Sequence, residues 1–350
     1  MTTSSAERDA MRRALALAAT PGIPLGPNPR VGCVLLDDAG RTVAEGFHRG
    51  AGTAHAEVDA LSRVDDAHGL TAVVTLEPCN HTGRTGPCSE ALLAGGVRRV
   101  VHALPDPTPE AQGGAQRLRE AGVEVESGLL ADDATRLNRG WLHGLEHGRP
   151  FVTWKLATSL DGRSAAADGT SRWVSNAASR RDTHRLRGEA DVMMVGTGTV
   201  LVDGPRLTVR DDHDQPLPRE VQPLRVVVGE RPVPADAAVL DDTAETWVTG
   251  TRDLHAVLAT LFQQGRRHVF LEGGPTLAGA FLQEGLVDEV VCYVAPMLIG
   301  AGIPSVQGLP FTTIADALHL DVLEVTTLGD APEIDVRLVM RPHHPRQEMD

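Results

Sequence analysis

The chain has 350 residues, of which 41% are apolar, and it carries a formal net charge of −14 at pH 7. This length favours two domains, and the acidic charge argues against broad contact with nucleic-acid phosphates, so a small-molecule substrate is expected. There is no run of about 18 apolar residues that would span a membrane, and no signal-peptide pattern at the start. Four cysteines fit a reducing compartment, so we expect a cytoplasmic protein without a nucleic-acid or membrane partner.

Residues 1–147 are expected to form one α/β domain. Helices are predicted at 5–19, 54–63, 88–94, 109–121 and 131–145, and strands at 31–36, 41–46, 72–76, 97–103 and 123–127. The first two strands flank the Asp37-Asp38-Ala39-Gly40 turn and form a hairpin. Alternation of the later strands with helices is typical of a three-layer α/β/α sandwich, whose functional residues gather at the carboxyl ends of the strands.

Two short motifs in this half carry candidate metal ligands. The first is His55-Ala56-Glu57, and the second places Cys79 after a predicted strand and Cys88 at the start of the next helix. One histidine and two cysteines are three good zinc ligands, and they leave the fourth position open for water, as catalytic zinc sites do. Glu57 stands where it could carry protons. The order His-x-Glu, then Pro-Cys and a second Cys, is typical of zinc nucleobase deaminases.

The spacing of the two cysteines leaves alternatives open. Eight residues, Asn80 to Pro87, separate them, whereas the general deaminase motif has two. A Cys79–Cys88 disulfide and two unrelated core cysteines are the alternative interpretations. His81, inside the intervening segment, could replace a ligand, although a surface position is the default for it and for His48.

A polar segment around residues 145–150 leads into a second α/β pattern, expected to span residues 150–341 and to end in a flexible tail at 342–350. Strands are predicted at 151–158, 191–195, 225–228, 246–249, 268–271, 288–295, 319–327 and 333–340, and helices at 176–187, from 196 onward, at 253–264 and at 277–284. The Gly196-Thr197-Gly198-Thr199 turn lacks the third glycine of a dinucleotide fingerprint. The turn from Glu272 to Thr276 could receive a pyrophosphate on free N–H groups, although either turn could be a plain connection.

Together these residues resemble the RibD family of bifunctional riboflavin-biosynthesis enzymes. The resemblance runs from about residue 8 to residue 340. It rests on the stretches Pro27 to Val34, His55 to Glu57, Thr75 to Cys88, Lys155 to Arg163 and Glu272 to Ala280. The eight-residue gap between the cysteines belongs to the motif of this family. The resemblance implies an N-terminal cytidine-deaminase-like three-layer sandwich and a C-terminal dihydrofolate-reductase-like α/β domain.

The resemblance also implies two consecutive reactions. The first is hydrolytic deamination of 2,5-diamino-6-(5-phosphoribosylamino)pyrimidin-4(3H)-one. In the second, NADPH reduces the ribose of 5-amino-6-(5-phosphoribosylamino)uracil to a ribityl chain. By this similarity His55, Cys79 and Cys88 bind Zn2+ and Glu57 is the proton shuttle. A homodimer or a higher homo-oligomer, formed through the reductase half, is implied as well.

Further residues are assigned to ligands by the same resemblance. NADPH contacts are expected from Ala157, Ser171, Trp173, Thr199, Asp203, Gly274, Pro275, Thr276, Leu277, Ala278, Gly279 and Ala280. Substrate contacts are expected from Asn28, Lys155, Arg187, Leu207, Arg210 and Glu272. An arginine suits a substrate phosphate, although a solvated arginine is the default. Trp173 could equally pack in a core, and Lys155 could merely pair with a carboxylate.

One position departs from the family pattern. The family usually reads Asp-Asp-Pro where this chain has Asp203-Gly204-Pro205. If the second Asp makes a necessary contact in the family, reductase activity is expected to be weaker here or its cofactor use to differ. Two competing functions are a nucleoside or tRNA deaminase with an appended non-catalytic or divergent reductase-like domain, and a zinc-stabilised binding protein without catalysis. Assays with cytidine or tRNA address the first competitor, and the Glu57→Gln variant addresses the second.

Overall fold

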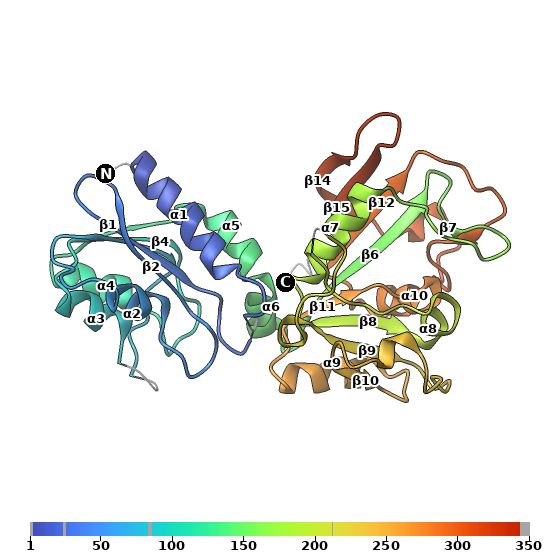
Figure 1. Ribbon diagram of the computed structural model, residues 1–350, viewed down its shortest axis with the longest axis horizontal. Coiled ribbons are helices and arrows are strands. Elements are labelled where there is room, and N and C mark those ends of the chain that lie inside the picture. Colours follow the sequence, from blue (N-terminus) through green and yellow to red (C-terminus); the bar gives the residue numbers. More distant parts are fainter. Residues whose placement is uncertain (1–2, 24–25, 83–85, 212, 344–350) are drawn as a thin grey trace. The chain divides into compact units, whose positions relative to one another are not determined.

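The computed structural model of the protein describes residues 3–23, 26–82, 86–211 and 213–343 (Figure 1). The chain divides into two compact units, Met1–Glu146 and His147–Asp350. The final strand continues through Pro342, where the tail was expected to begin, and residues 344–350 of that tail lie outside the described residues. In the described part of the chain, no helix combines the length and the apolar character needed to cross a membrane.

A five-stranded sheet forms the centre of the first unit, in the order β2-β1-β3-β4-β5. The strands are β1 (Gly32–Leu36), β2 (Thr42–Phe47), β3 (Thr71–Leu76), β4 (Arg99–Leu104) and β5 (Glu124–Ser127). Strand β1 runs antiparallel to β2 and to β3, whereas β3, β4 and β5 are mutually parallel. The carboxyl ends of the three parallel strands therefore lie at one edge of the sheet.

Helices cover both faces of this sheet. Side chains of α1 (Ser5–Ala18), α5 (Ala131–Leu137) and α6 (Arg139–His147) pack in one core cluster with the strands. Side chains of α2 (Ala56–Leu61), α3 (Cys88–Ala94) and α4 (Gly114–Glu120) pack in another. Since the apolar residues of β1, β3 and β4 alternate between the two clusters, the predicted three-layer sandwich is confirmed.

Two predicted helices of this unit differ from the structure. The helix expected at 109–121 begins only at Gly114, because Gly113 has a left-handed backbone (φ 95°) and the carbonyl of Ala111 accepts a hydrogen bond from the Asn80 N–H. The helix expected at 131–145 is two helices that meet at Asn138. The buried Asn138 side chain bonds both the N–H and the carbonyl of Arg30, a contact that periodicity cannot reveal.

The second unit contains an eight-stranded sheet in the order β10-β9-β8-β11-β6-β12-β15-β14. Its strands are β6 (Phe151–Ser159), β8 (Val192–Gly196), β9 (Leu224–Val228), β10 (Thr246–Val248), β11 (His268–Leu271), β12 (Glu289–Ala295), β14 (Leu320–Leu328) and β15 (Asp335–Pro342). The six strands from β10 to β12 are parallel, and β15 and β14 are antiparallel. A small pair formed by β7 (Arg163–Ala165) and β13 (Ile303–Pro304) was not predicted, because strands this short have no periodicity to detect.

Helices also cover both faces of the larger sheet. Apolar residues of α9 (Leu254–Gln263) and α10 (Pro275–Gln283) pack on one face. Residues of α7 (Ala177–Arg187) and α8 (Thr197–Asp203) pack on the other. The α/β class predicted for this half is thereby confirmed. Helix α10 begins two residues earlier than predicted, because Pro275 is favourable in the first helical turn.

Candidate active sites

Three predicted metal ligands converge at one edge of the smaller sheet. The Nδ1 atom of His55 lies 3.5 Å from the Sγ of Cys79 and 3.3 Å from the Sγ of Cys88. All three ligand atoms lie within 4.8 Å of one another. Such a cluster can share one tetrahedral ion and leave a fourth position open, which is the geometry expected of a catalytic zinc site.

Each ligand is placed by the end of a regular element. His55 is the N-cap residue of α2, and Cys88 is the first residue of α3. Cys79 follows β3 through Glu77 and Pro78, and the buried Glu77 carboxylate accepts hydrogen bonds from the N–H groups of residues 106, 113 and 115. These bonds fix the loop after β4 beside the cysteines. A Cβ on Gly114 would lie 1.7 Å from the Pro78 carbonyl oxygen, so only glycine fits there.

The sulfur atoms of Cys79 and Cys88 are suited to binding one metal cation. Both cysteines are free thiols, so the disulfide interpretation is wrong, and their shared contact with His55 shows that they are not unrelated core residues. The close approach of the two side chains lowers the pKa of the Cys79 thiol and raises the pKa of the Cys88 thiol. Binding of a divalent cation is what would make both of them thiolates.

Glu57 lies beside this cluster in the first turn of α2. Its side chain is only 3% exposed, and burial raises the pKa of its carboxyl from 4.5 to about 7. A carboxyl group with a pKa close to neutral can both accept and return a proton. The position and the burial of Glu57 therefore suit the role of proton carrier.

A second histidine, His48, was not predicted to belong to the site. It is buried, with its ring centroid 5.4 Å from that of His55. Burial lowers the pKa of His48, and a neutral ring that donates from Nδ1 to the Ala54 carbonyl leaves Nε2 to accept from the Asn28 amide, 3.0 Å away. The amide oxygen of Asn28 then remains available to a ligand. Only the folded structure shows that His48 orients Asn28, because His48 is not part of any recognisable sequence motif.

In the second unit, the strand order reverses between β8 and β11. Strand β8 leads through α8 to β9 on one side, and β11 leads through α10 to β12 on the other. Ligands of open α/β sheets bind in the crevice at such a switch point, outside the carboxyl ends of the strands. Two residues predicted to contact NADPH meet here, since the Gly274 N–H donates to the Thr199 hydroxyl at 3.2 Å.

The glycine-rich turn after β11 fits a bound dinucleotide. A Cβ on Gly274 would lie 3.3 Å from the Thr199 hydroxyl, so glycine keeps the N-terminus of α10 open to a phosphate. Within the predicted stretch, Ala278 is fully buried in the core, and a Cβ on Gly279 would lie 1.8 Å from the Gln307 carbonyl. Gly274, Pro275, Thr276, Leu277 and Ala280 keep part of their surface accessible, whereas Ala278 and Gly279 are buried.

The other residues predicted to contact NADPH lie on separate elements. Ala157 is on β6, and Ser171 and Trp173 lie in the segment before α7. Trp173 is 64% exposed, so the core-packing interpretation is wrong, and the Arg180 guanidinium lies 4.6 Å from its ring centroid. Asp203 ends α8, and Gly204 caps this helix with a left-handed backbone (φ 54°). Glycine is the favoured residue at such a cap, which gives a structural reason for Gly204.

Residues predicted to contact the substrate form a charged cluster in the same unit. Arg187 on α7 and Glu272 after β11 form a bidentate ion pair. The Arg187 Nε and Nη2 atoms donate to the two carboxylate oxygens of Glu272 at 2.6 and 2.9 Å. Side chains of this pair are only 15% and 14% exposed, so the solvated-arginine interpretation is wrong for Arg187. Lys155 on β6 lies with its Nζ 5.7 Å from the Tyr293 ring centroid. Burial lowers the pKa of Lys155, and the nearby Glu272 carboxylate opposes that effect.

The segment that carries Leu207 and Arg210 adjoins this cluster. The Thr208 carbonyl accepts a hydrogen bond from Arg187 at 3.1 Å, and the Thr208 hydroxyl accepts one from the Arg210 Nε at 3.2 Å. Leu207 is buried, and the Arg210 Nη1 also donates to the carbonyl of Asp214. Thr208 therefore connects two predicted substrate contacts, although no sequence motif marked it.

The Arg187–Glu272 pair should make the stability of the second unit depend on pH in acid. Burial alone would raise the pKa of Glu272, but the charge and hydrogen bonds of Arg187 outweigh it and lower this pKa from 4.5 to about 2. Because the folded-state pKa is depressed, the stabilisation is complete above pH 4.5 and is lost as the pH falls toward 2. We expect the melting-temperature difference between the unsubstituted protein and Glu272→Gln to shrink over this range. The melting temperatures are measured by tryptophan fluorescence, since three of the four tryptophans lie in the second unit. A melting-temperature difference that grows in acid would contradict the ion pair.

Comparison with known proteins finds a matching family for each unit. Residues 4–104 match the cytidine and deoxycytidylate deaminase zinc-binding region, and residues 150–331 match the RibD C-terminal domain. Riboflavin biosynthesis protein RibD of Mycobacterium tuberculosis is 48% identical over 90% of this chain and 92% of the relative. The Escherichia coli RibD is 40% identical over 94% of this chain and 98% of the relative.

A solved structure from Thermotoga maritima is also similar, with a TM-score of 0.84 and 29% identity over 97% of this chain and 99% of that one. It is the structure of a diaminohydroxyphosphoribosylaminopyrimidine deaminase/5-amino-6-(5-phosphoribosylamino)uracil reductase. With a zinc-ligand cluster in one unit, a reversal of strand order in the other and relatives matched over nearly their whole length, the chain belongs to the RibD family of riboflavin biosynthesis proteins.

Proposed function

We propose that the chain carries out two consecutive steps of riboflavin biosynthesis, one in each unit. The first unit hydrolyses an amino group of 2,5-diamino-6-(5-phosphoribosylamino)pyrimidin-4(3H)-one and releases ammonia. The second unit reduces the ribose of the product, 5-amino-6-(5-phosphoribosylamino)uracil, with NADPH. The observation that carries the first assignment is the convergence of three zinc ligands beside a buried carboxyl group.

In the deaminase step, His55, Cys79 and Cys88 would hold zinc and Glu57 would move protons. Bound zinc supplies a Lewis acid that lowers the pKa of its water to about 7. Glu57 would accept a proton from the attacking water and deliver protons to the ring nitrogen and to the departing amino group, which leaves as ammonia. Asn28, oriented by His48, offers its amide oxygen to the pyrimidine or its ribose. Burial of Glu57 keeps competing water away from this proton.

In the reductase step, NADPH would lie across the switch point, with its phosphates near Thr199 and Gly274. NADPH supplies the hydride, and the protein positions and charges the site. The exposed Trp173 ring offers a flat surface for stacking. The cations of Lys155 and Arg187 suit a phosphorylated sugar, and Glu272 holds Arg187 in place.

Location and assembly follow from the same reasoning. Four free, buried cysteines support a reducing cytoplasm. The edge strand β14 exposes Val322, Leu323 and Val325 by more than half. Apolar surface of this kind supports a homodimer or a higher homo-oligomer formed through the second unit.

A stepwise assay tests the two-site proposal with Cys79→Ser as the informative variant. We expect this variant to lose zinc and ammonia release, because a serine hydroxyl is a poor replacement for a zinc-bound thiolate. NADPH oxidation should persist when the deaminated uracil compound is supplied, since the ligands and the switch point belong to different units.

Zinc content, ammonia release and NADPH oxidation are measured separately, one substrate at a time. Cys292→Ser is the matched control, because Cys292 is a buried cysteine remote in sequence from the ligands; it should leave zinc content and ammonia release unchanged. Loss of NADPH oxidation in a folded Cys79→Ser protein would contradict two independent sites.

A further inference from the structure

Two side chains that the proposed reactions do not use, Gln222 and Arg225, hold the backbone of residues 206–209. This stretch, hereafter the 206–209 segment, carries Leu207 and Thr208 and is followed directly by Arg210. The inference below rests on the proposed function of the second unit, in which these residues face the substrate. It concerns what fixes their position.

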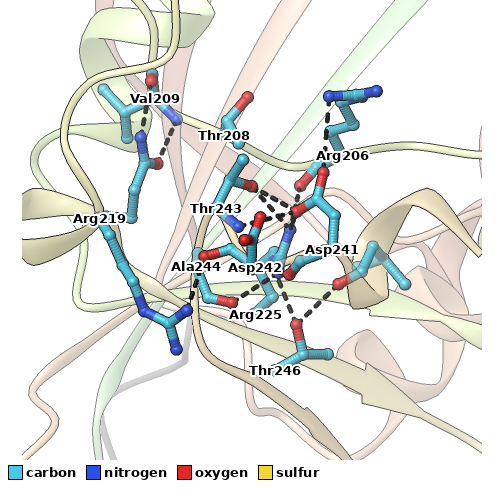
Figure 2. A network of polar contacts seen from close by, with 12 residues as sticks. Arg206, Thr208, Val209, Arg219, Arg225, Asp241, Asp242, Thr243, Ala244 and Thr246 are labelled. Carbon is cyan, nitrogen blue, oxygen red and sulfur yellow. Dashed lines mark hydrogen bonds and ion pairs between the residues drawn. The ribbon is translucent and has the colours of Figure 1, made fainter.

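Arg225 lies on β9 and is completely buried. Figure 2 shows its guanidinium surrounded by loop oxygens. Nη1 donates to the Arg206 carbonyl at 3.2 Å and to the Asp241 carboxylate at 2.8 Å, and Nη2 donates to the carbonyls of Asp241 and Ala244. A buried cation is tolerated only when its N–H groups are bonded in this way. Arg225 therefore fixes the start of the 206–209 segment to the strand.

Asp241 adds a second connection to the same point. One oxygen of its carboxylate accepts from Arg225, and the other lies 3.5 Å from the Nη1 of Arg206. The Asp241 carboxylate thus bridges the buried arginine and the side chain of the first residue in the segment. Both the backbone and the side chain of Arg206 are connected to β9 through this network (Figure 2).

Gln222 fixes the other end of the segment. Its Oε1 accepts from the Val209 N–H at 2.8 Å, and its Nε2 donates to the Val209 carbonyl at 3.0 Å and to the Leu217 carbonyl at 2.8 Å. The side-chain amide satisfies both backbone groups of Val209, as a neighbouring strand would. Gln222 is three residues before Arg225, so one short stretch of chain holds both ends.

Between these two anchors, Leu207 has a left-handed backbone (φ 55°). This conformation is unfavourable for leucine and persists only where the surroundings impose it. The Leu207 side chain is buried in the core, and the fixed neighbours Arg206 and Val209 impose its backbone. The turn directs the Thr208 carbonyl to Arg187 and the Thr208 hydroxyl to Arg210.

We infer that Gln222 and Arg225 are positioning residues for substrate binding in the reductase unit. They fix the 206–209 segment, and through Thr208 they orient Arg187 and Arg210 toward a phosphorylated substrate. Neither residue is among the expected NADPH contacts, and neither is one of the three zinc ligands. Their loss should therefore affect the binding of the pyrimidine substrate and leave the use of NADPH and the deamination step unchanged.

Gln222→Ala in the full-length enzyme tests this inference. We expect KM for 5-amino-6-(5-phosphoribosylamino)uracil to rise about tenfold, the effect of losing one or two net hydrogen bonds. KM for NADPH and the rate of ammonia release should stay unchanged. Gln222→Glu keeps the bond from the Val209 N–H but loses both donations, so its KM should lie between those of Gln222→Ala and the unsubstituted enzyme.

Arg219→Ala is the matched control, because Arg219 is exposed and donates to the Asp242 carbonyl of the same loop network (Figure 2). It should leave both KM values unchanged. The inference is overturned if Gln222→Ala leaves the pyrimidine KM unchanged, if both KM values rise together, or if Arg219→Ala has the same effect. An unsubstituted enzyme that does not oxidise NADPH with this substrate would instead refute the proposed function.

Discussion

Replacing Glu57 by glutamine should reduce ammonia release by about 10²- to 10⁴-fold, the usual contribution of a positioned proton carrier. Glutamine has nearly the same size and can form hydrogen bonds, but it cannot accept and return a proton. Because Glu57 is not among the three converging ligands, the zinc content should not change. Reduction of the deaminated compound by NADPH should also continue. The measurements are ammonia release, zinc content and NADPH oxidation on the same preparation.

Glu90→Gln is the matched control for this prediction. Glu90 lies on α3, two residues after Cys88, but its side chain is exposed and pairs with Arg117 at 2.6 Å. It should therefore release ammonia at the rate of the unsubstituted enzyme. Normal deamination by Glu57→Gln would refute the mechanism and favour a binding protein in which zinc only stabilises the fold. Loss of zinc together with activity would instead assign Glu57 a structural role at the cluster.

The zinc cluster could be predicted because its ligands are recognised by their residue types and their spacing in the sequence. His55, Cys79 and Cys88 stand at the junctions of strands and helices, and parallel strands bring such junctions to one edge of a sheet. His48 could not be predicted in the same way. Its contact with Asn28 joins two segments that are 20 residues apart, and only the folded chain shows that its ring is buried.

In the second unit, too, contacts between segments that are distant in the sequence could not be predicted. Strand and helix positions followed from periodicity, but the switch point between β8 and β11 depends on strand order, which periodicity does not contain. Arg187 and Glu272 are separated by 85 residues and still form a bidentate pair. Arg225 is in a strand whose other residues are apolar and buried. A lone arginine in such a strand is a sequence signal for a buried network, although its partners remain unknown until the loops are placed.

Replacing Arg187 by alanine should have the largest combined effect in the second unit. Removal of one partner from a buried ion pair leaves an uncompensated charge and costs about 3–5 kcal/mol of unfolding free energy. Here the orphaned group is the Glu272 carboxylate, whose pKa would rise once the charge of Arg187 is gone. The variant also removes a cation proposed to hold the substrate, so NADPH oxidation with the uracil substrate should fall at least about a hundredfold. Denaturant unfolding followed by tryptophan fluorescence measures the stability of this unit.

A double variant separates the two effects. Arg187→Met with Glu272→Leu replaces the pair by apolar side chains, which usually restores stability because no buried charge is left unpaired. Lys155 loses the carboxylate that opposes the lowering of its pKa, so burial lowers the pKa of Lys155 further in this variant. We therefore expect the double variant to recover most of the unfolding free energy and none of the NADPH oxidation. If activity returns with stability, the pair only supports the fold, and the substrate must be held by other residues such as Arg210.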